Sequence, residues 1–212
     1  MKYMYELIGT FFLVLTVGMT VLTPNSQGLA APLAIGAILA ALVYAGGHIS
    51  GAHYNPAVSL AVFLRGSLSK VDLFKYWAVQ LGAGALAAYV TLYLKGAPAD
   101  VAIQPETLKA LISEFLFTFA LCFVVLNVAT DKHTANNHYF GAAIGITVIA
   151  GAYAVGTISG GAFNPAVALG ITLMNLSSFA NLWIFIVANL AGAAVAALAF
   201  NVAHRDHQKK NR

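Results

Sequence analysis

The chain contains the triplet Asn-Pro-Ala twice, and the six residues are Asn55, Pro56, Ala57, Asn164, Pro165 and Ala166. Proline is favoured at the first position of a helix, because it has no N–H to lose there and its φ angle is already helical. Asparagine is a good cap in the position directly before. Each triplet therefore predicts the start of a helix, and the amide of the capping Asn can offer a hydrogen-bond donor to a passing oxygen atom.

The composition places these triplets in a membrane protein. Hydrophobic residues make up 60% of the 212 residues and charged residues 8%, with a mean hydropathy of +0.80. A soluble domain carries roughly 25% charged residues. We expect an all-α membrane protein, because six apolar stretches approach the length of about 20 residues that crosses a bilayer. The stretches are Met4–Thr23, Pro32–His48, Asp72–Leu94, Thr107–Ala129, His138–Thr157 and Phe179–Ala203.

Two shorter apolar runs begin at the triplets and cover Asn55–Leu64 and Asn164–Met174. Each has about ten residues and forms about 15 Å of helix at a rise of 1.5 Å per residue, so neither can cross the hydrocarbon alone. Such runs are either re-entrant segments or pieces of a soluble core. Because the rest of the chain is membranous, we expect re-entrant half-helices.

The glycine-containing stretches before the half-helices, at 48–54 and 157–163, are expected to be extended chain. Bare backbone at membrane depth is tolerated only where it lines a water-filled cavity or is buried in protein. These stretches therefore offer a ladder of carbonyl acceptors to a transport path. The carbonyls expected to line it belong to Gly51, Ala52, His53, Tyr54, Gly160, Gly161, Ala162 and Phe163.

The two halves of the chain repeat each other. Glu6 precedes Asn55 by 49 residues, and Glu114 precedes Asn164 by 50. Each half has three spans, an odd number, so the second half must enter the membrane from the opposite side. Short interrupted segments at matching positions of an inverted repeat point to a transport path. Within a single channel domain we assign residues 1–100 to the first repeat and 101–212 to the second.

The inverted repeat brings the two half-helix N-termini together near the bilayer centre. Each N-terminus carries about +0.5 of an elementary charge. Together they form a positive barrier, which disfavours protons and other cations while neutral molecules pass.

The basic residues predict the orientation in the membrane. Lys and Arg prefer short cytoplasmic loops. With the N-terminus inside, nine of the eleven basic residues are cytoplasmic and only Lys95 and Lys109 lie outside. Six spans then place both termini in the cytoplasm. The orientation in the membrane therefore explains the excess of basic over acidic residues without nucleic-acid binding. The nine are Lys2, Arg65, Lys70, Lys75, Lys132, Arg205, Lys209, Lys210 and Arg212.

The two loops, His48-Ile-Ser-Gly-Ala-His-Tyr-Asn-Pro-Ala-Val58 and Ser159-Gly-Gly-Ala-Phe-Asn-Pro-Ala166, resemble the two signatures of the aquaporin or major intrinsic protein family. The resemblance covers essentially the whole chain, and Ala129-Thr-Asp-Lys132 looks like a loop of bacterial members. It implies a right-handed bundle of six transmembrane helices and two re-entrant half-helices, with a pore through each subunit of a homotetramer. It also implies a passive channel without enzymatic activity or a cofactor, in the plasma or inner membrane of a microbe.

The resemblance gives roles to four ionisable residues. In the family, glutamates at the positions of Glu6 and Glu114 accept hydrogen bonds from the backbone of the re-entrant loops. A proton relay is the alternative for these two carboxylates. His48 and His53 are expected near the cytoplasmic vestibule. We expect no metal site there, because a site would need more ligands to converge.

The chain departs from the family at the narrow outer filter. Most members have Arg directly after the second triplet, and this chain has Val167. Counting back from the two Asn residues without gaps, the filter would consist of Ile35, Ala152, Gly161 and Val167. This set has no charge, no side-chain donor and no aromatic ring, so it should be wide and apolar. Some plant vacuolar members also have Val at the Arg position, and that group includes conductors of urea and ammonia.

We therefore expect a passive channel for water and small neutral solutes such as urea, ammonia and glycerol. The Asp that glycerol channels place after the Arg is replaced by Ala168. A strict water channel and a weakly ion-conducting channel remain as alternatives on the same scaffold. A coupled secondary transporter would usually need ionisable groups lining a site that moves. A membrane enzyme would need a nucleophile and base pair, and the sequence suggests none.

Overall fold

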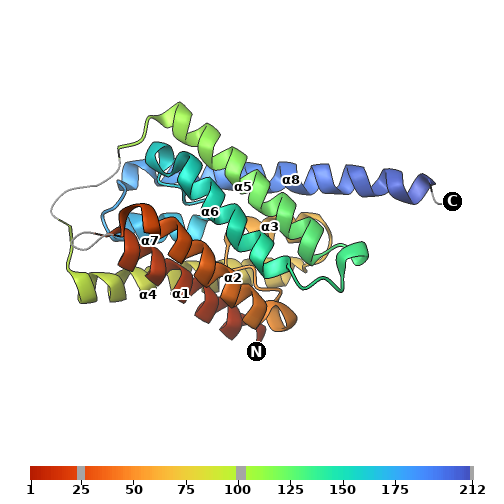
Figure 1. Cartoon of the computed structure of the whole chain (residues 1–212), viewed down its shortest axis with the longest axis horizontal. Helices are drawn as coiled ribbons and strands as arrows, with labels where there is room; N and C mark the ends of the chain where they lie inside the picture. Colours follow the sequence, from red (N-terminus) through yellow and green to blue (C-terminus); the bar gives the residue numbers. More distant parts are fainter. Residues whose placement is uncertain (23–26, 99–103, 211–212) are drawn as a thin grey trace.

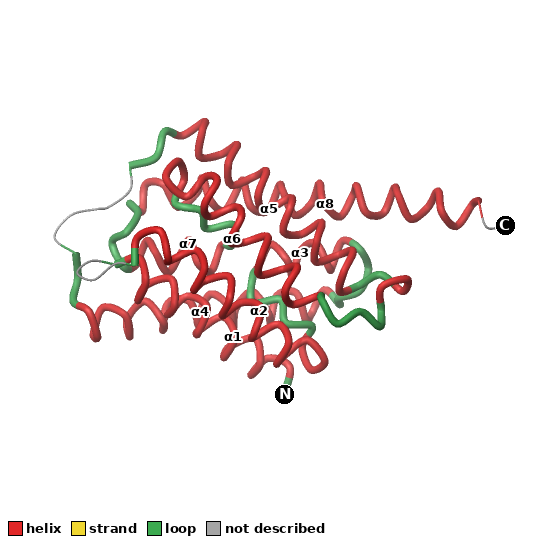
Figure 2. Tube along the Cα trace, viewed as in Figure 1, coloured by secondary structure: helices red, strands yellow, loops and turns green. Residues whose placement is uncertain are grey.

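The structure, a computed structural model, describes residues 1–22, 27–98 and 104–210, with the backbone alone for 205–210 (Figures 1 and 2). Its regular elements are helices. Six are long: α1 Lys2–Val21, α2 Ala31–Ser50, α4 Lys70–Lys95, α5 Thr107–Ala129, α6 Phe140–Ser159 and α8 Leu182–Lys210. Two are short: α3 Pro56–Leu64 and α7 Pro165–Leu173. Three are single 3₁₀ turns: η1 Gly28–Ala30, η2 Lys132–Thr134 and η3 Phe179–Asn181.

The expected all-α fold with six spans and two half-helices is confirmed. Within the described residues, six helical stretches are long and apolar enough to cross a membrane. The order long, long, short, long occurs once in α1–α4 and again in α5–α8. Some of the expected features lie outside the described residues. They are Thr23 at the end of the first span, the boundary between residues 100 and 101, the side chains of Arg205, Lys209 and Lys210, and Arg212.

The stretches before the short helices are not extended over their whole length, as the sequence had suggested. Helices α2 and α6 continue to Ser50 and Ser159, and each ends at a glycine in the left-handed region, Gly51 with φ 84° and Gly160 with φ 99°. Glycine adopts this conformation readily and often terminates a helix. The loops are therefore four residues long and turn sharply. Positive φ angles also occur at Ala52 (50°), Tyr54 (49°), Gly161 (63°) and Phe163 (48°).

The two halves are joined by a close contact between α2 and α6. A methyl group on Gly145 would lie 2.3 Å from the carbonyl oxygen of Gly36, and one on Gly36 would lie 2.6 Å from the carbonyl oxygen of Gly145. Both distances are far below van der Waals contact, so only glycine fits. Small residues let the backbones of membrane helices approach closely. This contact fixes the spacing of the two helices that carry Ile35 and Ala152.

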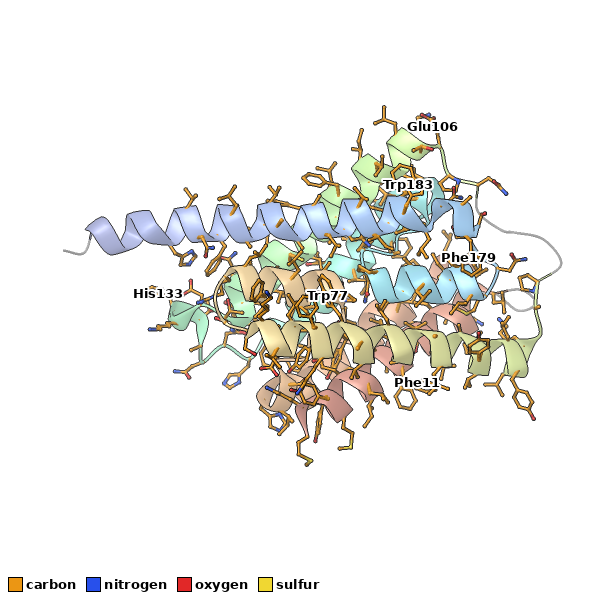
Figure 3. The ribbon with its side chains drawn as sticks, turned by 180° about the vertical axis from the view of Figure 1, so that it is seen from behind. Phe11, Trp77, Glu106, His133, Phe179 and Trp183 are labelled. Atoms are coloured by element: carbon orange, nitrogen blue, oxygen red, sulfur yellow. The ribbon has the colours of Figure 1, made fainter. Side chains whose placement is uncertain are left out.

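The outer surface is strongly apolar, as a bilayer requires. Phe179 and Trp183 are 65% and 50% exposed, and many aliphatic side chains on α8 also point outward. Figure 3 shows Phe179 and Trp183 at one end of the bundle and His133 at the other. Aromatic side chains such as Trp are enriched at the interface between membrane and water. Exposed apolar patches of this extent are rare on soluble monomers.

The C-terminal end of the half-helix α3 is fastened to α5 and α8 by polar contacts. Arg65 donates from Nε to Thr130 Oγ1 and from Nη2 to the Thr130 carbonyl, both at 2.7 Å. The neighbouring Asp131 bonds His204 Nε2 at 2.7 Å and accepts from the backbone N–H of His133 at 3.0 Å. The His133 N–H, followed by the bond to His204, holds the pKa of the Asp131 carboxyl well below its usual value. The Arg65 bonds, together with Asn201 Nδ2, which donates to the Leu64 carbonyl at 3.2 Å, hold the short helix in place from its far end. The Asp131 bond to His204 joins the loop after α5 to α8.

Candidate pore and selectivity site

The two short helices start where the triplets predict. Asn55 caps α3, and its Oδ1 accepts from the Ala57 N–H at 2.8 Å. Asn164 caps α7, and its Oδ1 accepts from the Ala166 N–H at 2.8 Å. In both cases proline is the first helical residue, so the missing N–H costs no hydrogen bond. The cap uses the amide oxygen of each Asn, so the amide nitrogen can donate hydrogen bonds to other groups.

Each capping Asn also binds the loop of the other half. Asn55 Nδ2 donates to the Phe163 carbonyl at 2.9 Å, and Asn164 Nδ2 donates to the Tyr54 carbonyl at 2.9 Å. The two bonds lock the half-helix starts together across the repeat. An Asn amide carries two N–H groups, so one donor on each Asn remains for a passing molecule.

Glu6 organises the first loop from inside the protein. It is fully buried, and its Oε1 accepts from Ser50 Oγ at 2.7 Å and from the His53 N–H at 2.9 Å. Its Oε2 accepts from the Tyr54 N–H at 2.7 Å and from Gln80 Nε2 at 2.8 Å. Four donors thus satisfy one buried carboxylate, and two of them are backbone groups of the sharply turned loop.

Glu114 repeats this arrangement in the second half with one donor fewer. It accepts from Ser159 Oγ at 2.7 Å and from the N–H groups of Ala162 and Phe163 at 2.9 and 2.7 Å. The residue that matches Gln80 is Asn189, whose side chain is one methylene shorter. It accepts from Thr118 instead, and its Nδ2 has no partner among the described residues.

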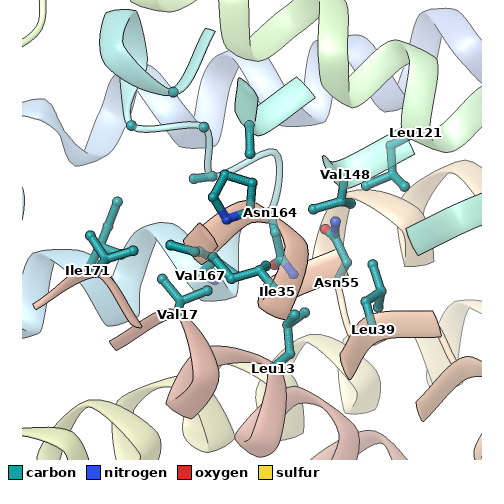
Figure 4. Close-up of a pocket in the computed structure, with 18 of the residues that line it drawn as sticks. Leu13, Val17, Ile35, Leu39, Asn55, Leu121, Val148, Asn164, Val167 and Ile171 are labelled. Atoms are coloured by element: carbon teal, nitrogen blue, oxygen red, sulfur yellow. Dashed lines mark hydrogen bonds between the residues drawn. The ribbon is translucent and has the colours of Figure 1, made fainter. Parts of the chain in front are cut away.

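A cavity of about 460 Å³ runs past both capping Asn residues. At one end it is lined by Leu29 in η1 and at the other by Val125 on α5 and Ile144 on α6. Figure 4 shows the side chains of Asn55 and Asn164 within this cavity. All four residues expected at the filter line it, namely Ile35, Ala152, Gly161 and Val167.

Aliphatic side chains dominate the walls of the cavity (Figure 4). No Lys, Arg, Asp or Glu side chain is among the described residues that line it. The side chains with hydrogen-bonding groups in the lining are His53, Asn55, Tyr153, Thr157 and Asn164. Tyr153 and Thr157 were not predicted as lining residues from the sequence. Their spacing of one and five residues from Ala152 on α6 is the signal that could have found them.

The carbonyl ladder is shorter than expected. Tyr54 and Phe163 do not line the cavity, because their carbonyls accept from the capping Asn residues and their side chains are buried in the core. Gly51, which ends α2, is also outside the lining. The expected carbonyl residues that do line the cavity are Ala52, His53, Gly160, Gly161 and Ala162.

The two histidines differ in position. His53 lines the cavity, contacts Ser59 Oγ through Nδ1 at 3.1 Å, and meets the ring of Tyr76 edge-on at 5.2 Å. His48 is exposed on the last turn of α2 and does not line the cavity, so the place of both histidines near the cytoplasmic vestibule stays a prediction. In the part of the chain that the structure describes, no group of three or more His, Cys, Asp or Glu residues could hold a metal ion.

Six membrane helices around an uncharged cavity, with two half-helices meeting at its centre, define the class of a membrane channel. Residues 1–200 match the family model for the major intrinsic protein family. The chain belongs to this family, the aquaporins. It is therefore an integral membrane protein and a passive channel of the kind that carries water and small solutes, and not an enzyme.

Relatives with known names support this assignment. Aquaporin NIP1-4 of Oryza sativa subsp. japonica is 36% identical over 93% of this chain and 74% of the relative. Glycerol uptake facilitator protein-like 6 of Lactiplantibacillus plantarum is 33% identical over 95% of this chain and 97% of the relative. The solved aquaglyceroporin of Plasmodium falciparum has a TM-score of 0.76 at 19% identity and 93% coverage of both chains, which shows the fold.

Proposed function

We propose that this channel passes small neutral solutes, including urea, ammonia and glycerol, in addition to water. The observation that carries the proposal is Val167 in the first turn of α7, where it lines the cavity and presents methyl groups. Ile35, Ala152 and Gly161 complete the filter, and none of the four has a polar side chain. The name of the bacterial relative, a glycerol uptake facilitator-like protein, supports a solute of this size.

Exclusion of ions rests on the two half-helices. The N-termini of α3 and α7 meet at Asn55 and Asn164, and each helix end adds about half a positive charge. A cation in the cavity would meet both ends without a carboxylate in the described lining to compensate. Neutral molecules with a carbonyl or hydroxyl oxygen can accept from the free N–H of either Asn.

Glu6 and Glu114 serve the pore by shaping the loops, and a proton relay is disfavoured. Neither carboxylate lines the cavity, and each accepts hydrogen bonds from two backbone N–H groups of its loop. The same design in both halves supports the two-repeat organisation of residues 1–100 and 101–212. The wide exposed apolar faces of the helices suit a bilayer. The resemblance to bacterial members favours a homotetramer in the plasma or inner membrane of a microbe, and the positions of Lys and Arg favour cytoplasmic termini.

In vesicles that contain the purified protein, we expect solute flux to be independent of ion gradients. Urea flux will be the same with and without an imposed proton or sodium gradient, because no Lys, Arg, Asp or Glu side chain is among the described residues that line the cavity. Stopped-flow light scattering measures the flux, and a planar bilayer recording on the same preparation will show no current above the lipid control. Gradient-driven accumulation would favour a coupled transporter. A sustained current would favour an ion channel.

A further inference from the structure

The cavity has a polar rim at the end where α6 finishes. Helix α6 lines the cavity with Val148, Ala152, Tyr153, Gly156 and Thr157. Residues three and four apart in a helix lie on the same face, so Tyr153 and Thr157 form one row beside the row of Ala152 and Gly156. Both side chains are exposed. They supply the aromatic ring and the hydroxyl groups that the four filter positions lack.

Tyr153 connects the two sides of the rim. Its hydroxyl donates to the carbonyl of Leu29 at 2.5 Å, across 124 residues of sequence. Leu29 lies in the η1 turn directly before α2, and Gly28 and Leu29 also line the cavity. The bond therefore spans from α6 to the start of α2, the two helices that carry Ala152 and Ile35. It holds the phenol ring beside the path that leads to the filter.

Thr157 carries the only side-chain hydroxyl in the described lining that has no protein partner. Six other threonines, in the helices or at a helix end, donate to the carbonyl four residues earlier, whereas Thr118 donates to Asn189 and the buried Thr10 hydroxyl has no partner among the described residues. The six are Thr16, Thr20, Thr91, Thr130, Thr147 and Thr172. Thr157 makes no such bond, although the Tyr153 carbonyl lies four residues before it. Its hydroxyl is free to donate to a molecule in the cavity and to accept from it.

Carbonyl acceptors lie close to Thr157 in the sequence. Gly160 and Gly161 line the cavity, and their carbonyls accept no hydrogen bond from the described residues. A methyl group on Gly161 would lie 3.4 Å from the Gly156 Cα, so the loop packs against the turn of α6 that carries Thr157. The rim thus combines a hydroxyl donor, carbonyl acceptors and the flat face of an aromatic ring.

We propose that this rim, formed by Leu29, Tyr153, Thr157, Gly160 and Gly161, is a binding subsite for small neutral amides of the urea class. Thr157 donates to the amide carbonyl oxygen, the glycine carbonyls accept from the amide N–H groups, and the Tyr153 ring packs against the planar solute. The subsite rests on the proposed function, because it selects among solutes that the wide filter admits. It makes Thr157 and Tyr153 specificity-determining residues outside the filter.

Replacement of Thr157 by Val tests the subsite, because Val keeps the shape and removes the hydroxyl. Urea flux of the wild-type channel in proteoliposomes will saturate with urea concentration. In Thr157→Val the half-saturating concentration will rise about three- to tenfold, as expected for one lost hydrogen bond, while water permeability changes by less than about twofold. Thr157→Ser restores the wild-type value. The matched control is Thr147→Val on the same helix, whose hydroxyl bonds Ala143 and does not line the cavity.

The outcomes separate this inference from the proposed function. Wild-type protein that passes water and none of urea, glycerol and ammonia would overturn both, and wild-type protein that passes glycerol or ammonia but no urea would overturn the subsite alone. Wild-type urea flux with the same half-saturation in Thr157→Val would overturn the subsite alone and leave the wide filter standing. An equal rise in Thr147→Val would also overturn the subsite, because the effect would then belong to helix α6 as a whole.

Discussion

Val167→Arg will lower urea and glycerol permeability by a factor of ten or more and retain water flux. The Val167 side chain lines the cavity at the start of α7, so a long Arg side chain at this position projects into the same space. The guanidinium group fills the opening left by Ala152 and Gly161 and leaves room for a molecule the size of water. A tenfold change in rate corresponds to an increase of about 1.4 kcal/mol in the permeation barrier. A bulky side chain that fills the opening can readily cause an increase of this size. Stopped-flow light scattering on proteoliposomes measures both permeabilities.

Val167→Met is the matched control, because it lengthens the side chain without adding charge or donors. We expect Met to lower urea permeability less than Arg does, and to leave ion exclusion unchanged. Equal urea permeability in Val167→Arg and in the wild type would show that position 167 does not set the width of the pore. Size-exclusion profiles of both variants establish that the assembly is intact before the fluxes are compared.

Glu6→Gln will destabilise the protein and reduce all permeabilities together. The carboxylate accepts four hydrogen bonds in a fully buried site, and the amide nitrogen of Gln cannot accept any. Two donors therefore lose their partner, at a cost of about 1–3 kcal/mol each. The His53 and Tyr54 N–H groups bond different carboxylate oxygens, so one of them is among the two donors that lose their partner, and the loop before α3 loosens. A thermal unfolding scan in detergent, with water flux on the same samples, tests this expectation.

The control for this change is Glu106→Gln at the surface. Glu106 pairs with Lys109 at 2.6 Å, and both side chains are more than half exposed. Exposed ion pairs contribute little to stability, so this variant should melt like the wild type. A Glu6→Gln protein that also melts like the wild type would contradict the role assigned to the buried carboxylate.

The architecture was predictable because its signals are local in the sequence. Apolar runs of sufficient length indicated the six spans, and proline after asparagine indicated the starts of α3 and α7 at Pro56 and Pro165. The inverted repeat followed from matching landmarks such as Glu6 and Glu114. The spans and helix starts depend on composition or on a few neighbouring residues, and the repeat depends on matched spacings along the chain, so tertiary contacts do not override these signals.

The details of the pore depended on tertiary contacts and were harder to predict. The loops were expected to be extended. Instead α2 and α6 continue to Ser50 and Ser159, and the glycine after each helix turns the chain sharply. The carbonyls of Tyr54 and Phe163 were expected to face solutes, but each accepts from the Asn of the opposite half. Nothing in the local sequence shows that Thr157 lacks the usual bond of a helical threonine, because its surroundings come from the packing of α6 against other segments.

The most direct test of the account measures water, urea, glycerol and ammonia permeability of the wild-type channel in parallel. Stopped-flow experiments on proteoliposomes give all four values on one preparation, with protein-free liposomes as the baseline. The account predicts that urea, ammonia or glycerol crosses well above the baseline along with water, because Val167 leaves the filter wide and uncharged. Fast water flux with the other three solutes at the baseline would contradict it, and would mean that the cavity closes around water alone.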